Sequence, residues 1–388
     1  MSIQGLHSAV AKMESNGLSK TFVNVFSRLY KLLEEGASSY ILESDVTALR
    51  NIPSLKDLVP QETREISAEE KLVAQKTMVI KLNGGLGTTM GLDKAKSLLP
   101  VRKNSDGSTD AFLDVIIKNQ IARREKFDAD LPLLFMNSFR TSKDTLEYIA
   151  KYGNINKNNL PIEIMQHFEP KITQDLLEPV EFPENPDLEW CPPGHGDFYA
   201  SFYDSGVLDE YVKAGYEYAF VSNADNLGSA FDPQIALFFA KSKASMMLEL
   251  ADKTDLDIKG GHIVKDKRGR LVLREVAQIR DEDKEIALDM KNHPYFNTNS
   301  IWLNLKDLKK KLDETQGVID LPLIANKKTV NPKDKSTTPV YQLETAIGAA
   351  IGSFENSAVV NVSRDRFLPV KTHADLERVR TLLAKAVA

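Results

Sequence analysis

Short apolar runs alternate with amphipathic or polar stretches from residue 77 onward. These runs have the length of β-strands, and several are apolar at successive positions, which is typical of strands buried on both faces. A helix-like segment such as 112–126 lies between early runs. The pattern predicts an α/β fold with helices on both faces of a sheet. The expected strands are 77–82, 131–136, 162–165, 218–222, 246–250, 271–273, 300–303 and 359–362.

Three other parts of the chain have a different pattern. Residues 1–70 are charged, with apolar side chains at helical spacing between Phe22 and Leu33, so we expect a helical N-terminal region there. The α/β domain would then cover 71–388. Within it, 252–295 carries polar strand pairs and glycine turns, which predicts a small β insertion beside the main sheet. The final segment, 373–388, predicts one more amphipathic helix.

Composition narrows the class of protein. A chain of 388 residues is long enough for about two or three packed units. The 50 basic and 55 acidic residues give a net charge of −5, which disfavours nucleic acid and anionic membranes as partners. No apolar stretch approaches the roughly 18 residues of a membrane span, and no signal peptide is evident. The single cysteine, Cys191, excludes an internal disulfide. We therefore expect a cytoplasmic enzyme.

A glycine-rich loop directly follows the first predicted strand. Residues 82–91 read LNGGLGTTMG, and such a loop allows backbone N–H groups to approach phosphates without a Cβ in the way. The dinucleotide fingerprint fails, because Met90 occupies the place of its third glycine. The Walker A pattern fails as well, because Ala95 precedes Lys96 and Ser97. The loop therefore predicts a phosphate site of another type.

That loop, with Lys96 and Ser97, resembles the signature of the UTP–glucose-1-phosphate uridylyltransferase family. Four further segments are similar to that family and follow its order: 192–197 (PPGHGD), 222–226 (SNADN), 296–299 (FNTN) and 366–372 (RFLPVKT). The resemblance covers about residues 75–375. It implies a Rossmann-like nucleotidyltransferase fold with a mixed, mostly parallel sheet, so 71–388 would be the catalytic domain. It also implies Mg²⁺-dependent, reversible transfer of uridylyl from UTP to glucose 1-phosphate, giving UDP-glucose and pyrophosphate.

The chain departs from the family in two places. Eukaryotic members usually read GCKGPKS where residues 91–97 read GLDKAKS, so Asp93 and Ala95 alter the phosphate loop, and Lys94 could compensate for the lost basic residue. Many members also carry a C-terminal β-helix domain that serves in oligomerisation. Few residues follow Lys371, so we expect that domain to be absent and leave the oligomeric state open.

The implied chemistry needs cations and positioning rather than a nucleophilic side chain. A phosphomonoester has a second pKa of about 6 and is already largely dianionic at neutral pH, so it needs no general base. Asp225 follows the strand predicted at 218–222, where ligands of open α/β sheets bind, and an acid there suits Mg²⁺. By resemblance, Lys96 contacts the triphosphate and Lys371 neutralises the α-phosphate. The expected catalytic residues are thus Lys96, Lys371 and Asp225, with Asp225 as the metal ligand.

The resemblance also implies two sets of binding residues. Amide groups suit a uracil ring, and Asn or Glu side chains suit vicinal hydroxyls. The UTP set is Leu82, Asn83, Gly84, Gly85, Gln166 and Gly194. The sugar-phosphate set is His195, Asn223, Gly260, Gly261, Glu275, Asn297, Thr298 and Asn299.

Two other sugar substrates and one non-catalytic class of protein are alternatives to this prediction. Enzymes for N-acetylglucosamine 1-phosphate usually show AGGQG where residues 83–87 read NGGLG, which argues against that sugar. Galactose 1-phosphate stays an alternative, because one epimeric hydroxyl is read by geometry. A non-catalytic nucleotide-sugar sensor would be expected to lack Lys96, Asp225 or Lys371, and all three are present.

Overall fold

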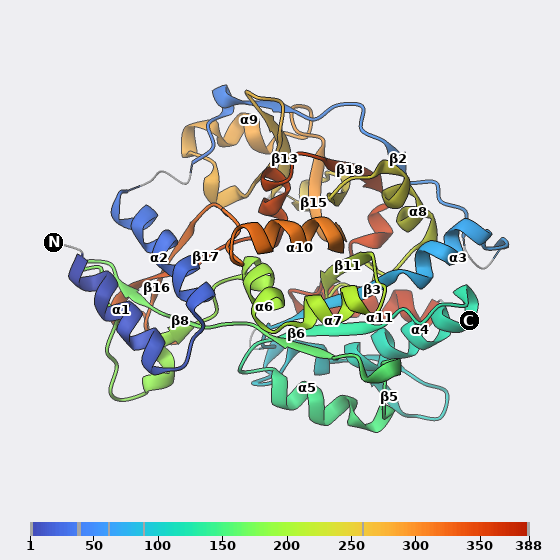
Figure 1. Ribbon diagram of the computed structural model, residues 1–388, viewed down its shortest axis with the longest axis horizontal. Coiled ribbons are helices and arrows are strands. Elements are labelled where there is room, and N and C mark those ends of the chain that lie inside the picture. The colour runs from blue at the N-terminus through green and yellow to red at the C-terminus, as the bar shows by residue number, and fades with distance from the viewer. Residues whose placement is uncertain (1–2, 37–39, 61–62, 88–89, 258–259, 386–388) are drawn as a thin grey trace.

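The structure is a computed structural model that describes residues 3–36, 40–60, 63–87, 90–257 and 260–385 (Figure 1). Its centre is an eight-stranded sheet in the order β2-β18-β12-β15-β11-β3-β6-β7. Neighbouring strands are parallel, except that β15 is antiparallel to both β11 and β12. The strands are β2 (Ser54–Leu55), β18 (Ser357–Val362), β12 (Met246–Asp252), β15 (Tyr295–Asn304), β11 (Tyr218–Asn223), β3 (Thr77–Asn83), β6 (Leu133–Asn137) and β7 (Glu163–Met165).

Helices cover both faces of this sheet, as the sequence predicts. Side chains alternate along β3, so Met78 and Ile80 enter one core cluster and Val79 enters the other. The first cluster includes α6 (Phe198–Asp204), α7 (Val207–Lys213) and α10 (Leu305–Glu314). The second includes α3 (Ala68–Gln75), α4 (Phe112–Phe127) and α8 (Pro233–Ser242). The predicted α/β fold with a mixed, mostly parallel sheet is confirmed.

Smaller sheets surround the main one. The predicted insertion contains β13 (His262–Asp266) and β14 (Leu271–Arg274), and β1 (Val46–Ala48) pairs with β13 to make a three-stranded sheet. A second three-stranded sheet joins β16 (Ile324–Thr329), β17 (Pro339–Glu344) and β9 (Ile172–Thr173). The apolar pattern did not predict β16, whose exposed lysines interrupt it. Two hairpin-like pairs complete the set: β4 (Pro100–Lys103) with β5 (Thr109–Ala111), and β8 (Glu169–Pro170) with β10 (Trp190–Cys191).

The N-terminal region begins with α1 (Ile3–Ser15) and α2 (Lys20–Glu34), which confirms the helical start. The apolar face of α2 packs Phe22, Phe26 and Leu29 against the sheet that contains β17, beside which Figure 1 shows both helices. Two short segments of this region, 46–48 and 54–55, are strands rather than helix, because β1 joins the insertion sheet and β2 joins the edge of the main sheet. A domain boundary near residue 70 stays a prediction.

The last helix, α11 (His373–Lys385), lies along β4 and α4, where Leu376 and Val379 are buried. Its position matches the amphipathic segment predicted at the end of the chain. Among the described residues, no helix is both long enough and apolar enough to cross a membrane.

Candidate active site

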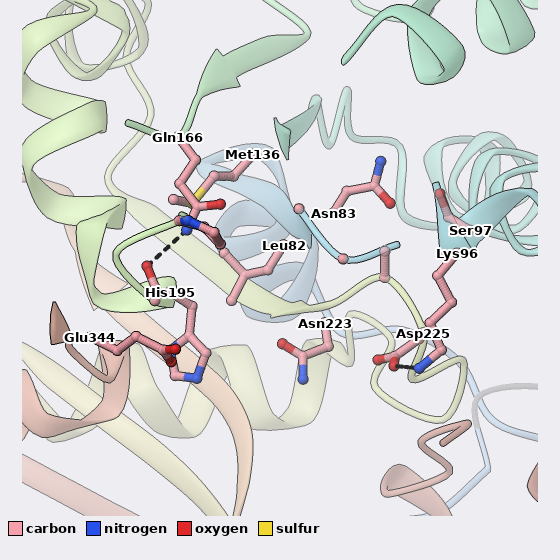
Figure 2. A pocket seen from close by; sticks show the side chains of 15 residues that line it. Leu82, Asn83, Lys96, Ser97, Met136, Gln166, His195, Asn223, Asp225 and Glu344 are labelled. Atoms are coloured by element: carbon pink, nitrogen blue, oxygen red, sulfur yellow. Dashed lines mark hydrogen bonds and ion pairs between the residues drawn. The ribbon is translucent and has the colours of Figure 1, made fainter. Parts of the chain in front are cut away.

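A cavity of about 300 Å³ lies beyond the carboxyl ends of β3, β6 and β11 (Figure 2). These three ends meet because β11 and β6 both run parallel to β3. This is the edge at which open α/β sheets bind ligands. The lining residues are Leu82, Asn83, Gly84, Gly85, Lys96, Ser97, Met136, Gln166, Pro192, Gly194, His195, Asn223, Ala224, Asp225 and Glu344.

The glycine loop forms one wall of the cavity and returns on itself. The Gly87 amide donates to the Lys94 carbonyl at 3.0 Å, and the Lys96 amide donates to the Gly85 carbonyl at 3.0 Å. A Cβ built on Gly85 would meet no atom within 4 Å, so the backbone there faces open space. Such a wall allows close approach by a phosphorylated ligand. Thr88 and Thr89 of the motif lie outside the described residues.

The loop brings Lys96 to Asp225, two residues predicted to be catalytic. Lys96 Nζ lies 2.5 Å from Asp225 Oδ2, and both side chains are mostly buried. Figure 2 shows the pair at one end of the cavity, with Gln166, His195 and Glu344 toward the other end. A cation and a carboxylate side by side can bind phosphate oxygens and a divalent cation together.

The Gln166 side chain lies at the opposite end of the cavity, between Gly84 and Gly194. Its Nε2 donates to the Gly194 carbonyl at 2.8 Å, and its Oε1 lies 2.8 Å from where a Cβ of Gly84 would be. The Gln166 amide is therefore held in one orientation. Asn83 differs, because its side chain turns away from the cavity and donates to Asn137 Oδ1 and Thr145 Oγ1 at 2.7 and 2.9 Å. Only the backbone of Asn83 is placed to meet a ligand.

His195 is a neutral hydrogen-bond donor at this site. The Ile347 amide donates to His195 Nδ1 at 2.9 Å, which leaves the ring proton on Nε2. Burial lowers the pKa of His195 to about 4, so the ring carries no charge at neutral pH. Gly194 precedes it with a φ of 78°, and a Cβ there would lie 2.6 Å from the Thr345 carbonyl oxygen. The loop is thus closely packed on the end of β17.

A bulge in β15 brings two of the predicted sugar-reading asparagines to Asn223. The register between β12 and β15 shifts after Glu249, and Asn299 adopts a φ of 59°. Asn299 Nδ2 then donates to Asn223 Oδ1 at 3.0 Å, and the backbone N–H of Asn299 donates to Asn297 Oδ1 at 3.1 Å. Thr298 is not part of this group, because its buried hydroxyl donates to the Glu249 carbonyl at 2.7 Å inside the sheet.

Lys371 and Gly260 line a second cavity of about 320 Å³ rather than the first. Glu275 lies beside them: it packs on Gly261, where a Cβ would be 2.6 Å from Oε2. Burial raises the pKa of Glu275, and the charge of Lys371 limits that rise. The structure therefore groups Lys371, Gly260, Gly261 and Glu275 and keeps them apart from Lys96.

The segment that carries Lys371 is fastened to the loop that carries Asp225. Asn226 Nδ2 donates to the Arg366 carbonyl at 3.1 Å, and Asn226 Oδ1 accepts from the Leu368 amide at 2.8 Å. Arg366 itself makes a two-pronged ion pair with buried Glu249, with N–O distances of 2.7 and 2.9 Å. The two cavities are therefore built around one rigid junction.

Several lining residues were not predicted from the sequence. Met136 ends the predicted strand 131–136, so its position at a strand end was a usable signal. Ser97 is buried, and its Oγ has no hydrogen-bond partner among the described residues. Glu344 belongs to β17, which no apolar pattern indicated, and burial raises the pKa of its carboxyl.

An open, mostly parallel sheet with a glycine loop and a Lys–Asp pair at its ligand-binding edge defines an α/β protein with a site suited to a phosphorylated ligand. A family model described as UTP--glucose-1-phosphate uridylyltransferase matches residues 20–386. The chain belongs to this family, which confirms the resemblance of its motifs.

Individual relatives agree with this assignment. The Encephalitozoon cuniculi protein named UTP--glucose-1-phosphate uridylyltransferase is 42% identical over 86% of this chain, and the chain spans 64% of that relative's length. The Saccharomyces cerevisiae protein of that name is 38% identical, over 92% of this chain and 69% of its own. A crystal structure of UDP-glucose phosphorylase from Trypanosoma brucei superposes with a TM-score of 0.87, at 39% identity, covering 97% of this chain and 79% of that chain. A Leishmania major UDP-glucose pyrophosphorylase variant in complex with UDP-glucose gives a TM-score of 0.84 at 37% identity, with the same two coverages.

Proposed function

We propose that this chain transfers uridylyl from UTP to glucose 1-phosphate, reversibly giving UDP-glucose and pyrophosphate. The observation that carries the proposal is a single cavity with two chemically different ends. One end is lined by the amide of Gln166 and the backbone of Gly84 and Gly194, groups that suit a uracil edge. The other end holds the Lys96–Asp225 pair, which suits phosphates.

The residues of the chain account for the main demands of this reaction. An oxygen of the sugar phosphate attacks the α-phosphorus of UTP in line, the bond to the β-phosphate oxygen breaks, and pyrophosphate leaves. Lys96 would neutralise the phosphates from the glycine loop, and Lys371 would do so from its own segment. His195, held with its proton on Nε2, can donate to a phosphate or sugar oxygen without adding charge. Asn223, Asn297 and Asn299 would bind sugar hydroxyls.

We propose Mg²⁺ as the cofactor, held by Asp225. No group of three or more His, Cys, Asp or Glu side chains suited to a metal occurs in the described part of the chain. Mg²⁺ is commonly bound through one or two carboxylates, with substrate phosphates and waters as its other ligands, so a lone Asp225 beside Lys96 fits that ion. When bound, Mg²⁺ would neutralise charge on the phosphates and align them. The cytoplasmic location stays a prediction.

The test is a coupled assay of pyrophosphate release, with UTP and a panel of sugar 1-phosphates. We expect glucose 1-phosphate to be the best acceptor. Asp225→Ala should lose most of its activity and respond weakly to added Mg²⁺, whereas the exposed control Asp187→Ala should behave as the native chain. Equal use of UTP and ATP would contradict the uridylyl assignment. Better use of galactose 1-phosphate would correct the sugar, and an unchanged Mg²⁺ requirement in Asp225→Ala would contradict the metal ligand.

A further inference from the structure

His167 is a mostly buried histidine that lines neither cavity described above. Its Nδ1 lies 2.9 Å from Asp197 Oδ1, and its Nε2 lies 3.5 Å from Asp204 Oδ2. The ring stacks on Phe22 of α2, with centroids 4.4 Å apart and planes within 7°. Ser19, at the start of the same helix, hydrogen-bonds Asp204. The imidazole is thus enclosed by two carboxylates and an aromatic ring.

The network around His167 joins segments that carry predicted substrate-binding residues. His167 directly follows Gln166, and its backbone amide donates to Asp197 Oδ2 at 2.7 Å. Asp197 lies two residues after His195 and also accepts from Ser201 Oγ at 2.7 Å. The backbone and the ring of one residue therefore both bind Asp197. A shift of that carboxylate would move Gln166 and His195 relative to each other.

We propose that His167 is a positioning residue for uridine recognition, which sets Gln166 and the His195 loop at their present separation by binding Asp197 and Asp204. This inference rests on the proposed function. The charge of the ring supports it. Burial alone would lower the pKa of His167, but the two aspartates raise it to about 9. At neutral pH the ring is an imidazolium, and it can donate to both carboxylates. The ring also contacts Phe22 and the Ser201 hydroxyl, which are both neutral.

The experiment compares His167→Leu, His167→Asn and the native chain in steady-state kinetics with UTP. Leu removes both donors, whereas Asn keeps one amide donor near the place of Nδ1. We expect Leu to raise KM for UTP about tenfold, which corresponds to about 1.4 kcal/mol of binding free energy, with kcat nearly unchanged. Asn should recover most of the loss. His7→Leu, on the exposed face of α1, is the matched control and should match the native chain.

A pH profile separates positioning from a purely structural role. In the native chain, KM for UTP should rise as the pH passes about 9, where His167 loses its proton. Ionisation of the uracil N3–H of UTP at alkaline pH adds a rise that is common to every variant, so His167→Asn should show only this common and smaller rise. Because Asn keeps a donor, it also serves as the test if the Leu variant does not fold.

Two results would overturn the inference: variants at His167 with native KM for UTP, or the same rise above pH 9 in the Asn variant. A native chain that releases no pyrophosphate from UTP would instead contradict the proposed function. In that case calorimetry of UTP binding to the native chain and to His167→Asn tests the positioning role by itself.

Discussion

Gly85 and Gly194 both line the active-site cavity, yet the structure predicts opposite effects of an added methyl group. At Gly85 a Cβ meets nothing within 4 Å, and the backbone does not require a positive φ. Gly→Ala at a compatible site stabilises a protein by about 0.4–1 kcal/mol, because the unfolded chain loses freedom. We therefore expect Gly85→Ala to be at least as stable as the native chain. The same methyl group projects into the space where phosphates are expected, so KM for UTP should rise at least tenfold.

At Gly194 the methyl group has no room. The φ of 78° and ψ of 171° lie in a region essentially restricted to glycine, which costs another residue about 1–3 kcal/mol. The Cβ would also lie 2.6 Å from the Thr345 carbonyl oxygen, and relieving such a contact costs about 1–3 kcal/mol more. Gly194→Ala should therefore lose roughly 2–6 kcal/mol of unfolding free energy. Gly107→Ala is the control, because Gly107 has a similar φ of 84° and no atom within 4 Å of its Cβ position.

Urea denaturation of the three variants measures stability, and pyrophosphate release measures activity. The reasoning fails at Gly194 if its variant is no less stable than Gly107→Ala, since the close contact would then have no cost. It fails at Gly85 if the folded variant keeps the native KM, since the ligand would then not approach that backbone. A Gly85 variant that is strongly destabilised would show that the space is filled by the protein itself.

Three further predictions concern buried and exposed charges. Lys371 is exposed, so Lys371→Ala should keep the native melting temperature while kcat falls about a hundredfold, the usual effect of removing a preorganised cation. Arg366→Met leaves Glu249 buried without its ion pair and should cost about 3–5 kcal/mol of unfolding free energy; adding Glu249→Gln should recover part of that loss, and no recovery would contradict the pair. Burial lowers the pKa of the His262 ring to about 2, so between that pH and about 6.5 only the unfolded chain binds its proton, and this residue alone should lower the free energy of unfolding by about 1.4 kcal/mol for each pH unit of acidification. In pH-dependent denaturation His262→Leu should show a shallower fall, and an equal slope would contradict the buried neutral ring.

The main sheet could be predicted from the sequence because its strands are buried on both faces. β3 contains the apolar run 78–80 and β6 the apolar run 133–136, so the pattern alone located them. β17 has an interrupted burial pattern and pairs with the polar strand β16 and with β9, which is far away in the sequence, so no local signal indicated it. Glu344, at the end of β17, was missed for that reason.

Motifs predicted which residues gather near the site but not where each side chain points. Asn83 belongs to the glycine motif, yet its side-chain amide joins β3 to β6 and to α5 (Ser142–Ile149). Thr298 belongs to the FNTN motif, yet its hydroxyl bonds inside the sheet. In both cases strand geometry decides the outcome, because successive side chains leave a strand on opposite faces.

A motif can reveal a part of the site only if the residues that hold that part lie close together in the sequence. Backbone hydrogen bonds within residues 85–96 hold the glycine loop, so one short segment of sequence determines them. The segment that carries Lys371 is held by Arg366, whose partner Glu249 lies 117 residues away. No sequence pattern around Glu249 indicates that its side chain holds the segment that carries Lys371. Because Asn226 bonds that same segment, the positions of Asp225 and Lys371 depend on one junction. A substitution at Glu249 should therefore affect both, although neither cavity contains that residue.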